Sequence, residues 1–338
     1  MKRIKNETKN GKNRAGSILN ALTILLIILC FQSLAAVEDG GGSVSIGSSY
    51  DSNPGDDETS TTRGGRKDLL KDVGDFSLDL STDLFIYPVQ QLYLDYFTSL
   101  SYTFKDESYS FFSHNAEIAY EHEFVSTDLN LGLIFGHTVY DFNEVYNRIE
   151  IEPYIETVHY QSDNSSGWYR LSWQYRYPSE FSDIYYEGQK ISADISELIT
   201  FMNRRSSLFL NSSFSLYLLE DSTEIYDATT VEKRNSYFSF AENIRLKLGL
   251  SIFDLIPGIS YEFLYFFESD EWSGIKKKRT DHAIAPSFKI VINATDFLAI
   301  VFGYKYLKNF STLGESDSDY YDYNYDRHRV MLEFSFKF

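Results

Sequence analysis

The feature that most constrains this chain is an alternation of apolar and polar residues with a period of two, which recurs about fourteen times. Around Trp173, for example, apolar residues at odd positions alternate with Arg170, Ser172 and Gln174 at even positions. Successive side chains of a strand point to opposite faces, so this period predicts strands with one apolar and one polar face. The expected strands are 42–50, 73–86, 91–104, 112–124, 129–140, 147–160, 167–177, 186–197, 206–219, 236–250, 255–267, 280–292, 297–308 and 325–338.

The lengths of these segments and of their connections predict a membrane barrel rather than a soluble sandwich. Most segments have 9–15 residues, which is enough for a tilted strand to cross a bilayer, whereas strands in soluble proteins usually have about five or six. Short connections such as 125–128 and 251–254 alternate with long polar ones such as 51–71 and 220–235. We therefore expect an all-β fold, a transmembrane antiparallel up-and-down β-barrel of about fourteen strands, with twelve or sixteen as alternatives.

The N-terminus has the three-part pattern of a secretory signal peptide. Six basic residues precede an apolar run from Ile18 to about Leu34, and the small residues Ala35 and Ala36 follow. The pattern predicts that residues 1–36 are cleaved and that 37–338 form the barrel, whereas a retained anchor helix is the alternative. The only cysteine, Cys30, falls inside the leader, so the mature chain is expected to contain no disulfide and no thiolate site.

The C-terminal strand resembles the final-strand signal of bacterial outer-membrane β-barrel proteins, because alternating aromatic residues end in a phenylalanine. This signal comprises Phe334, Phe336 and Phe338. The resemblance implies insertion into the bacterial outer membrane by the barrel-assembly machinery. It also implies contact with outer-membrane lipids and lipopolysaccharide.

A second resemblance concerns the first expected strand. The run from Val44 to Pro54 (VSIGSSYDSNP) resembles the opening strand in the barrel domain of surface lipoprotein assembly modifiers. In those proteins a tetratricopeptide-repeat domain precedes the barrel, whereas here only a few residues separate the expected leader from Val44. The resemblance therefore implies a barrel subtype and not the export role of that family.

Assigning the polar face of each strand to the lumen predicts two groups of charge on opposed walls. The acidic wall would consist of Asp79, Asp83, Asp95, Glu117, Glu121, Glu123, Glu150, Glu152 and Glu156. The basic wall would consist of Arg170, Arg176, Arg245, Lys247, Lys289, Lys305, Arg327 and Arg329. Opposed walls of this kind would order water and sort solutes by charge.

These patterns predict a porin-like passive channel for small hydrophilic solutes, since fourteen strands enclose more space than side chains fill. Two alternatives stay open. Charged side chains that pair across the lumen would plug a purely structural barrel. An accessory barrel for the export of surface proteins or polysaccharide would need a separate periplasmic partner. Nucleic acid is a poor partner because the formal net charge is −18.

We expect no enzyme activity, no catalytic residues, no metal site and no cofactor. The six histidines are scattered singly along the sequence, most of them on the apolar face, and no G-x-S-x-G motif occurs. The acidic runs 51–57 and 315–326 do not follow the spacing of a calcium loop. They are interpreted as solvated surface loops.

Three local features qualify the pattern. Aromatic residues near strand ends, among them Trp168, are interpreted as interfacial girdles. Glu242 shares its parity with lipid-facing residues, so we expect a bulge or a shifted register beside it. Proline removes a ladder donor, so bulges are also expected at Pro153, Pro257 and Pro286.

Overall fold

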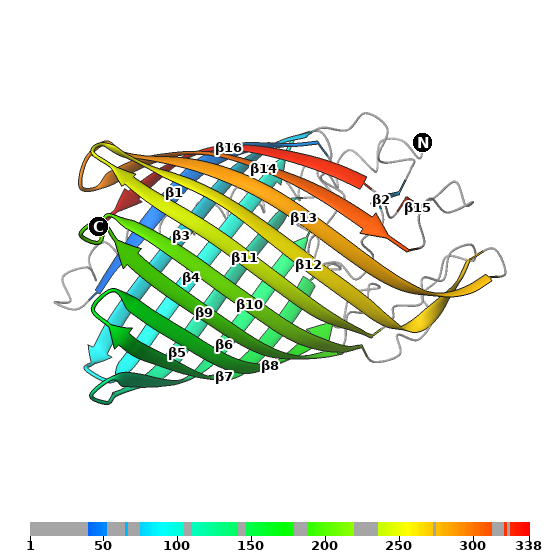
Figure 1. Ribbon diagram of the computed structural model, residues 1–338, viewed down its shortest axis with the longest axis horizontal. Helices are drawn as coiled ribbons and strands as arrows, with labels where there is room; N and C mark the ends of the chain where they lie inside the picture. Colours follow the sequence, from blue (N-terminus) through cyan, green and yellow to red (C-terminus); the bar gives the residue numbers. More distant parts are fainter. Residues whose placement is uncertain are drawn as a thin grey trace, which may run out of the picture.

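The protein is a closed antiparallel β-barrel of fourteen strands, seen in a computed structural model that describes residues 40–52, 65–66, 75–104, 110–140, 147–178, 188–219, 236–272, 275–312, 321–322 and 325–338 (Figure 1). This architecture confirms the predicted fold class and the preferred strand number. The predicted leader lies outside the described residues, as do most of the two acidic runs. Within the described part, no helix has the length and hydropathy that crossing a membrane requires.

The barrel strands follow one another around the wall in sequence order. Their bounds are β1 Gly40–Asp51, β3 Asp75–Val89, β4 Leu92–Thr103, β5 Phe111–Glu123, β6 Thr127–Tyr140, β7 Asn147–Ser162, β8 Ser165–Pro178, β9 Gly188–Phe201, β10 Ser206–Leu219, β11 Tyr237–Leu250, β12 Phe253–Trp272, β13 Ile275–Asn293, β14 Leu298–Ser311 and β16 Tyr325–Lys337. A separate two-stranded sheet pairs β2 (Gly65–Arg66) with β15 (Tyr321–Asp322).

The first and last strands close the barrel. In the register of β1 with β16, Val44 pairs with Phe336 and Tyr50 pairs with Val330. At one end of this seam the guanidinium of Arg327 forms an ion pair with the Asp51 carboxylate at 2.5 Å. The C-terminal residue is held as well, because the Phe338 amide donates to the Gly42 carbonyl.

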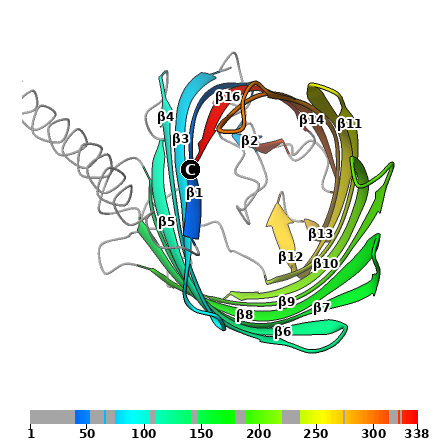
Figure 2. The same ribbon diagram turned by 90° about the vertical axis from the view of Figure 1, so that its left-hand side faces the viewer.

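Outward positions of the barrel strands are mostly apolar and inward positions are mostly polar, although Tyr237, Leu264 and Phe266 form an apolar cluster on the inner side. The apolar set points outward and includes Leu131, Leu133 and Phe135, each more than 40% exposed. The polar set lines the interior seen end-on in Figure 2. A barrel with an exposed apolar exterior is stable only in a bilayer or a similar apolar medium.

Short turns gather at the end of the barrel where the C-terminus lies, on the left of Figure 1; we name this the turn end and the opposite one the loop end. The turn between β9 and β10 is unusual because Met202, Asn203 and Arg204 have φ values of 51°, 56° and 63°. Non-glycine residues rarely adopt this left-handed conformation. Its occurrence here indicates that the two strand ends fix the turn.

The hairpin of β12 and β13 is longer than the sequence predicted, because the segment 268–279 was expected to be a connection. The pairing instead continues to Trp272 and Ile275, after a register shift between Tyr265 and Ser269. In this extension Asp270 pairs with Lys277 in the register.

The bulges expected at three prolines and at Glu242 are absent. The register is the same on both sides of Pro153, Pro257 and Pro286, and only the pairings next to each proline are interrupted on one edge. Glu242 lies in an unbroken register opposite Ser212, whose hydroxyl donates to the Glu242 carboxylate at 2.8 Å. A local hydrogen bond, and not a change of register, therefore accommodates this outward carboxylate.

Candidate functional site

Strand pairing places all seventeen predicted wall residues on the face of the sheet opposite the exposed apolar set. The carboxylates, on β3, β4, β5 and β7, are Asp79, Asp83, Asp95, Glu117, Glu121, Glu123, Glu150, Glu152 and Glu156. The cations, on β8, β11, β13, β14 and β16, are Arg170, Arg176, Arg245, Lys247, Lys289, Lys305, Arg327 and Arg329.

Neutral hydrogen-bond donors hold several of the carboxylates on β3 to β7, which we name the acidic group. Asp79 accepts hydrogen bonds from Ser49 at 3.0 Å and Ser101 at 2.7 Å, and from Ser77 on its own strand. Glu156 accepts from the Asn130 amide at 3.1 Å. Such donors stabilise a carboxylate without cancelling its charge. Asp79 and Glu156 are therefore held by neutral partners.

Tyr154 is the central packing residue of this wall. Its hydroxyl donates to the Glu117 carboxylate, which lies two strands away on β5. The ring can reach that far because it passes over Gly132 on β6, where an added Cβ would lie only 2.2 Å from the ring. The Arg170 guanidinium then stacks on the same ring at 3.7 Å. Four strands, β5 to β8, are thus connected through one tyrosine.

Arg170 and Arg176 lie beside the acidic group and not across the lumen from it. The Arg176 guanidinium contacts Glu150 at 2.8 Å, and Arg148 contacts the same carboxylate at 3.0 Å. Arg170 approaches Glu152 at 3.6 Å. These ion pairs join residues of the same or neighbouring strands. None of them crosses the lumen.

The remaining six cations, which we name the basic group, come from β11 to β16. In the strand order, β11 to β14 are seven positions from β4 to β7 and so face them across the barrel. Arg245 stacks over the Phe209 ring at 4.7 Å, and Lys247 pairs with Asp254 on β12 at 3.0 Å. Lys289 and Arg329 are exposed in the lumen. The strands that carry the basic group thus lie opposite strands that carry the acidic group, and two of its cations are paired locally, Lys247 with Asp254 and Arg327 with Asp51.

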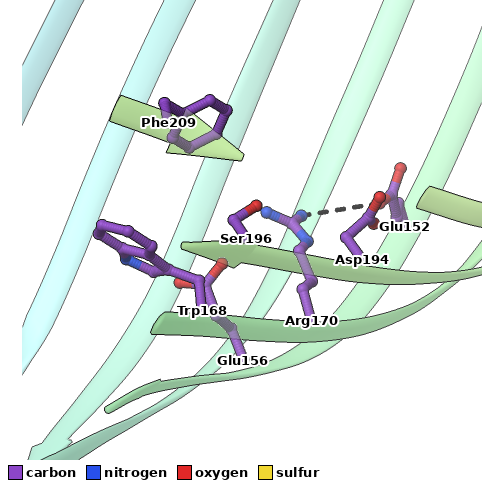
Figure 3. A pocket seen from close by; sticks show the side chains of 7 residues that line it. All are labelled: Glu152, Glu156, Trp168, Arg170, Asp194, Ser196 and Phe209. Carbon is purple, nitrogen blue, oxygen red and sulfur yellow. Dashed lines mark ion pairs between the residues drawn. The ribbon is translucent and has the colours of Figure 1, made fainter. Parts of the chain in front are cut away.

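A hollow of about 360 Å³ opens in the lumen wall over β7 to β10 (Figure 3). The prediction that Trp168 is an interfacial girdle residue is wrong, because its ring lines this hollow. Trp168 lies near the end of β8, but it shares the even parity of Arg170, and this parity places its side chain on the inner face. The lining residues are Glu152, Glu156, Trp168, Arg170, Asp194, Ser196 and Phe209.

The outer face has polar contacts that sequence reasoning missed, among them two that involve histidine. The His114 and His137 rings, which are far apart in the sequence, are hydrogen-bonded at 2.8 Å between Nε2 and Nδ1. On β12 and β13, Tyr261 and His282 form a bond of 2.8 Å. His114 and His137 come together only because β5 pairs with β6. Among the described residues, no group of three or more His, Cys, Asp or Glu side chains is arranged to hold a metal ion.

No protein-family model and no curated protein matches the sequence. Among solved structures, outer-membrane expressed OmpT of Vibrio cholerae is similar, with a TM-score of 0.51 and 7% identity over 89% of this chain and 97% of that chain. This chain has the fold of an outer-membrane β-barrel. Lower TM-scores relate it to an anion-selective porin from Comamonas acidovorans (0.45, 11% identity, 88% and 98% covered) and a bacterial polysaccharide outer membrane secretin (0.43, 12% identity, 88% and 98% covered).

Proposed function

We propose that this protein is a passive channel in the bacterial outer membrane for small hydrophilic solutes, with acidic and basic groups on facing walls. The observation that carries the proposal is the way in which lumen charges are satisfied. The ion pairs of Glu150, Glu152 and Asp254 are made along the wall, so these long side chains do not bridge the barrel. Charged, hydrated walls favour polar solutes over apolar ones.

The two groups would act on a solute at the same time. A cation is attracted to β3–β7 and an anion to β11–β16, so a solute with both charges is turned across the barrel axis. Interactions of this kind act within about 8 Å at physiological ionic strength. Selectivity should therefore be modest for small ions. It should be greatest for solutes that pass close to a wall.

Insertion in the outer membrane forms part of the proposal. The outward apolar face suits the lipid, and the C-terminal Phe334, Phe336 and Phe338 would be recognised by the barrel-assembly machinery during insertion. Lipopolysaccharide would contact the loop end. The short turns would then lie in the periplasm, as in other outer-membrane barrels.

Cysteine accessibility in planar bilayers tests the channel directly. The single cysteine of the chain is in the predicted leader, so a cysteine can be placed in the mature barrel at Ser213, on the inner face, or at its neighbour Phe214, on the outer face. We expect a cationic methanethiosulfonate reagent to lower the current through the Ser213→Cys protein. The matched Phe214→Cys protein should not respond. The absence of any conductance in either orientation would overturn the proposal.

A further inference from the structure

The hollow over β7 to β10 has two unlike ends. Two aromatic rings, Trp168 on β8 and Phe209 on β10, lie at one end together with Glu156, and Arg170, Asp194 and Glu152 lie toward the other (Figure 3). Ser196 on β9 lies between them and is paired with Trp168 in the register. Aromatic rings that face water instead of lipid expose apolar area at a cost in free energy. A ligand with a flat apolar part would remove that cost.

The lining of the hollow carries more negative than positive charge. Three carboxylates, Glu152, Glu156 and Asp194, line the hollow together with one guanidinium, that of Arg170. Arg170 is already engaged, because it stacks on Tyr154 and approaches Glu152 at 3.6 Å. The partner of Glu156 is the neutral amide of Asn130.

A further cation, Arg245, lies at the aromatic end. The Arg245 guanidinium covers the Phe209 ring at 4.7 Å. Because a guanidinium shields one face of this ring, the ring's other face is suited to an apolar group or a second cation. Trp168 has the larger π-surface and is the stronger site for either.

We propose that this hollow binds small organic cations in which a primary ammonium is joined to a flat apolar group. The flat group would lie against Trp168 and Phe209, and the ammonium would donate to Glu156, which lies beside Trp168. This inference names a substrate class for the proposed channel and so rests on the proposed function. Aromatic contact and charge contact together favour such a ligand over a neutral or anionic molecule of the same shape.

Fluorescence of Trp168 measures binding without any need for conductance. The chain has three tryptophans, so Trp173→Phe and Trp272→Phe leave Trp168 as the only one. This protein, folded in detergent, is titrated with phenethylamine, 2-phenylethanol and phenylacetate, which share a ring but differ in charge. We expect a saturable change with phenethylamine and at least ten-fold weaker responses with the other two. Equal responses to all three would overturn the inference.

Variants in the same background locate the site. Phe209→Ala and the pair Glu156→Gln with Asp194→Asn should each weaken phenethylamine binding about ten-fold, which corresponds to about 1.4 kcal/mol. Asp79→Asn is the matched control, because Asp79 is an inner-face carboxylate outside the hollow, and it should leave binding unchanged. Strand content measured by circular dichroism verifies that each variant is folded. If binding is unaffected by Phe209→Ala and by the carboxylate pair, the inference is wrong.

Current block separates this inference from the proposed function. If the hollow lies on the solute path, phenethylamine should reduce the single-channel current, and Glu156→Gln with Asp194→Asn should relieve that block. Saturable fluorescence without conductance would contradict the channel and leave the binding site. Conductance without selective fluorescence would contradict the binding site and leave the channel.

Discussion

The two charged groups of the lumen differ in how they are built. Carboxylates of the acidic group are mostly half-buried, and serine, asparagine and tyrosine side chains such as Ser101, Asn130 and Tyr154 hold them in place. In the basic group, Arg245, Lys289 and Arg329 are exposed on long side chains. The carboxylates of the acidic group are therefore held in place by hydrogen bonds, whereas the exposed side chains of Arg245, Lys289 and Arg329 have room to change conformation. A preorganised wall loses less entropy when a ligand binds.

The largest expected effect breaks the packing of the acidic group. In Gly132→Ala the new methyl group would enter the Tyr154 ring, so we expect a loss of about 2 kcal/mol in the free energy of unfolding. Gly303→Ala on β14 is the matched control, because its Cβ would meet only the mobile end of Met331. Urea unfolding of both variants in lipid vesicles measures the difference. Equal losses would show that the two walls are equally rigid.

The next effect concerns the ion pairs where the acidic group meets its arginines. Glu150→Gln removes the carboxylate that Arg148 and Arg176 share, and we expect it to cost about 2 kcal/mol. Glu123→Gln changes an exposed carboxylate of the same wall and should stay within about 0.5 kcal/mol. Unfolding midpoints measured at low and high salt check this, since half-buried pairs are screened less than exposed ones. A smaller loss in Glu150→Gln than in Glu123→Gln would contradict the comparison.

The smallest effect is on ion selectivity. Neutralising exposed charge on one wall, with Asp83→Asn and Glu123→Gln, should move the reversal potential in a salt gradient toward anions. Lys289→Gln with Arg329→Gln should move it toward cations. Each shift should be about two-fold in permeability ratio, or about 0.4 kcal/mol, because exposed charges in water interact weakly. Shifts of the same sign in both double variants would show that the walls do not act separately.

Much of the fold could be predicted from the sequence, because period two fixes both the strands and their faces. The extended β12–β13 hairpin was missed because its polar residues carry no apolar alternation. The sequence does contain one signal for this hairpin. Two acidic residues, Asp270 and Glu271, are followed closely by two basic residues, Lys276 and Lys277.

The candidate site was less predictable because it depends on which strands are neighbours and how far side chains reach. Parity placed Glu152 and Arg170 in the lumen but could not tell whether they pair along the wall or across it. The hollow required Trp168 and Phe209, two strands apart, to meet over a small residue on β9. The contact of Tyr154 with Glu117 depends on a missing side chain at Gly132, which no alternation of apolar residues reveals.

The seam between β1 and β16 has a consequence for the order in which the molecule folds. Strand β1 can pair with β16 only after β16 has been synthesised, since Ser43 pairs with Lys337. Closing a loop of that length costs about 5 kcal/mol in chain entropy. Until closure, both edges display unpaired backbone groups that other chains can bind. The time spent with the seam open therefore sets the risk of aggregation, and shortening β16 should lengthen it.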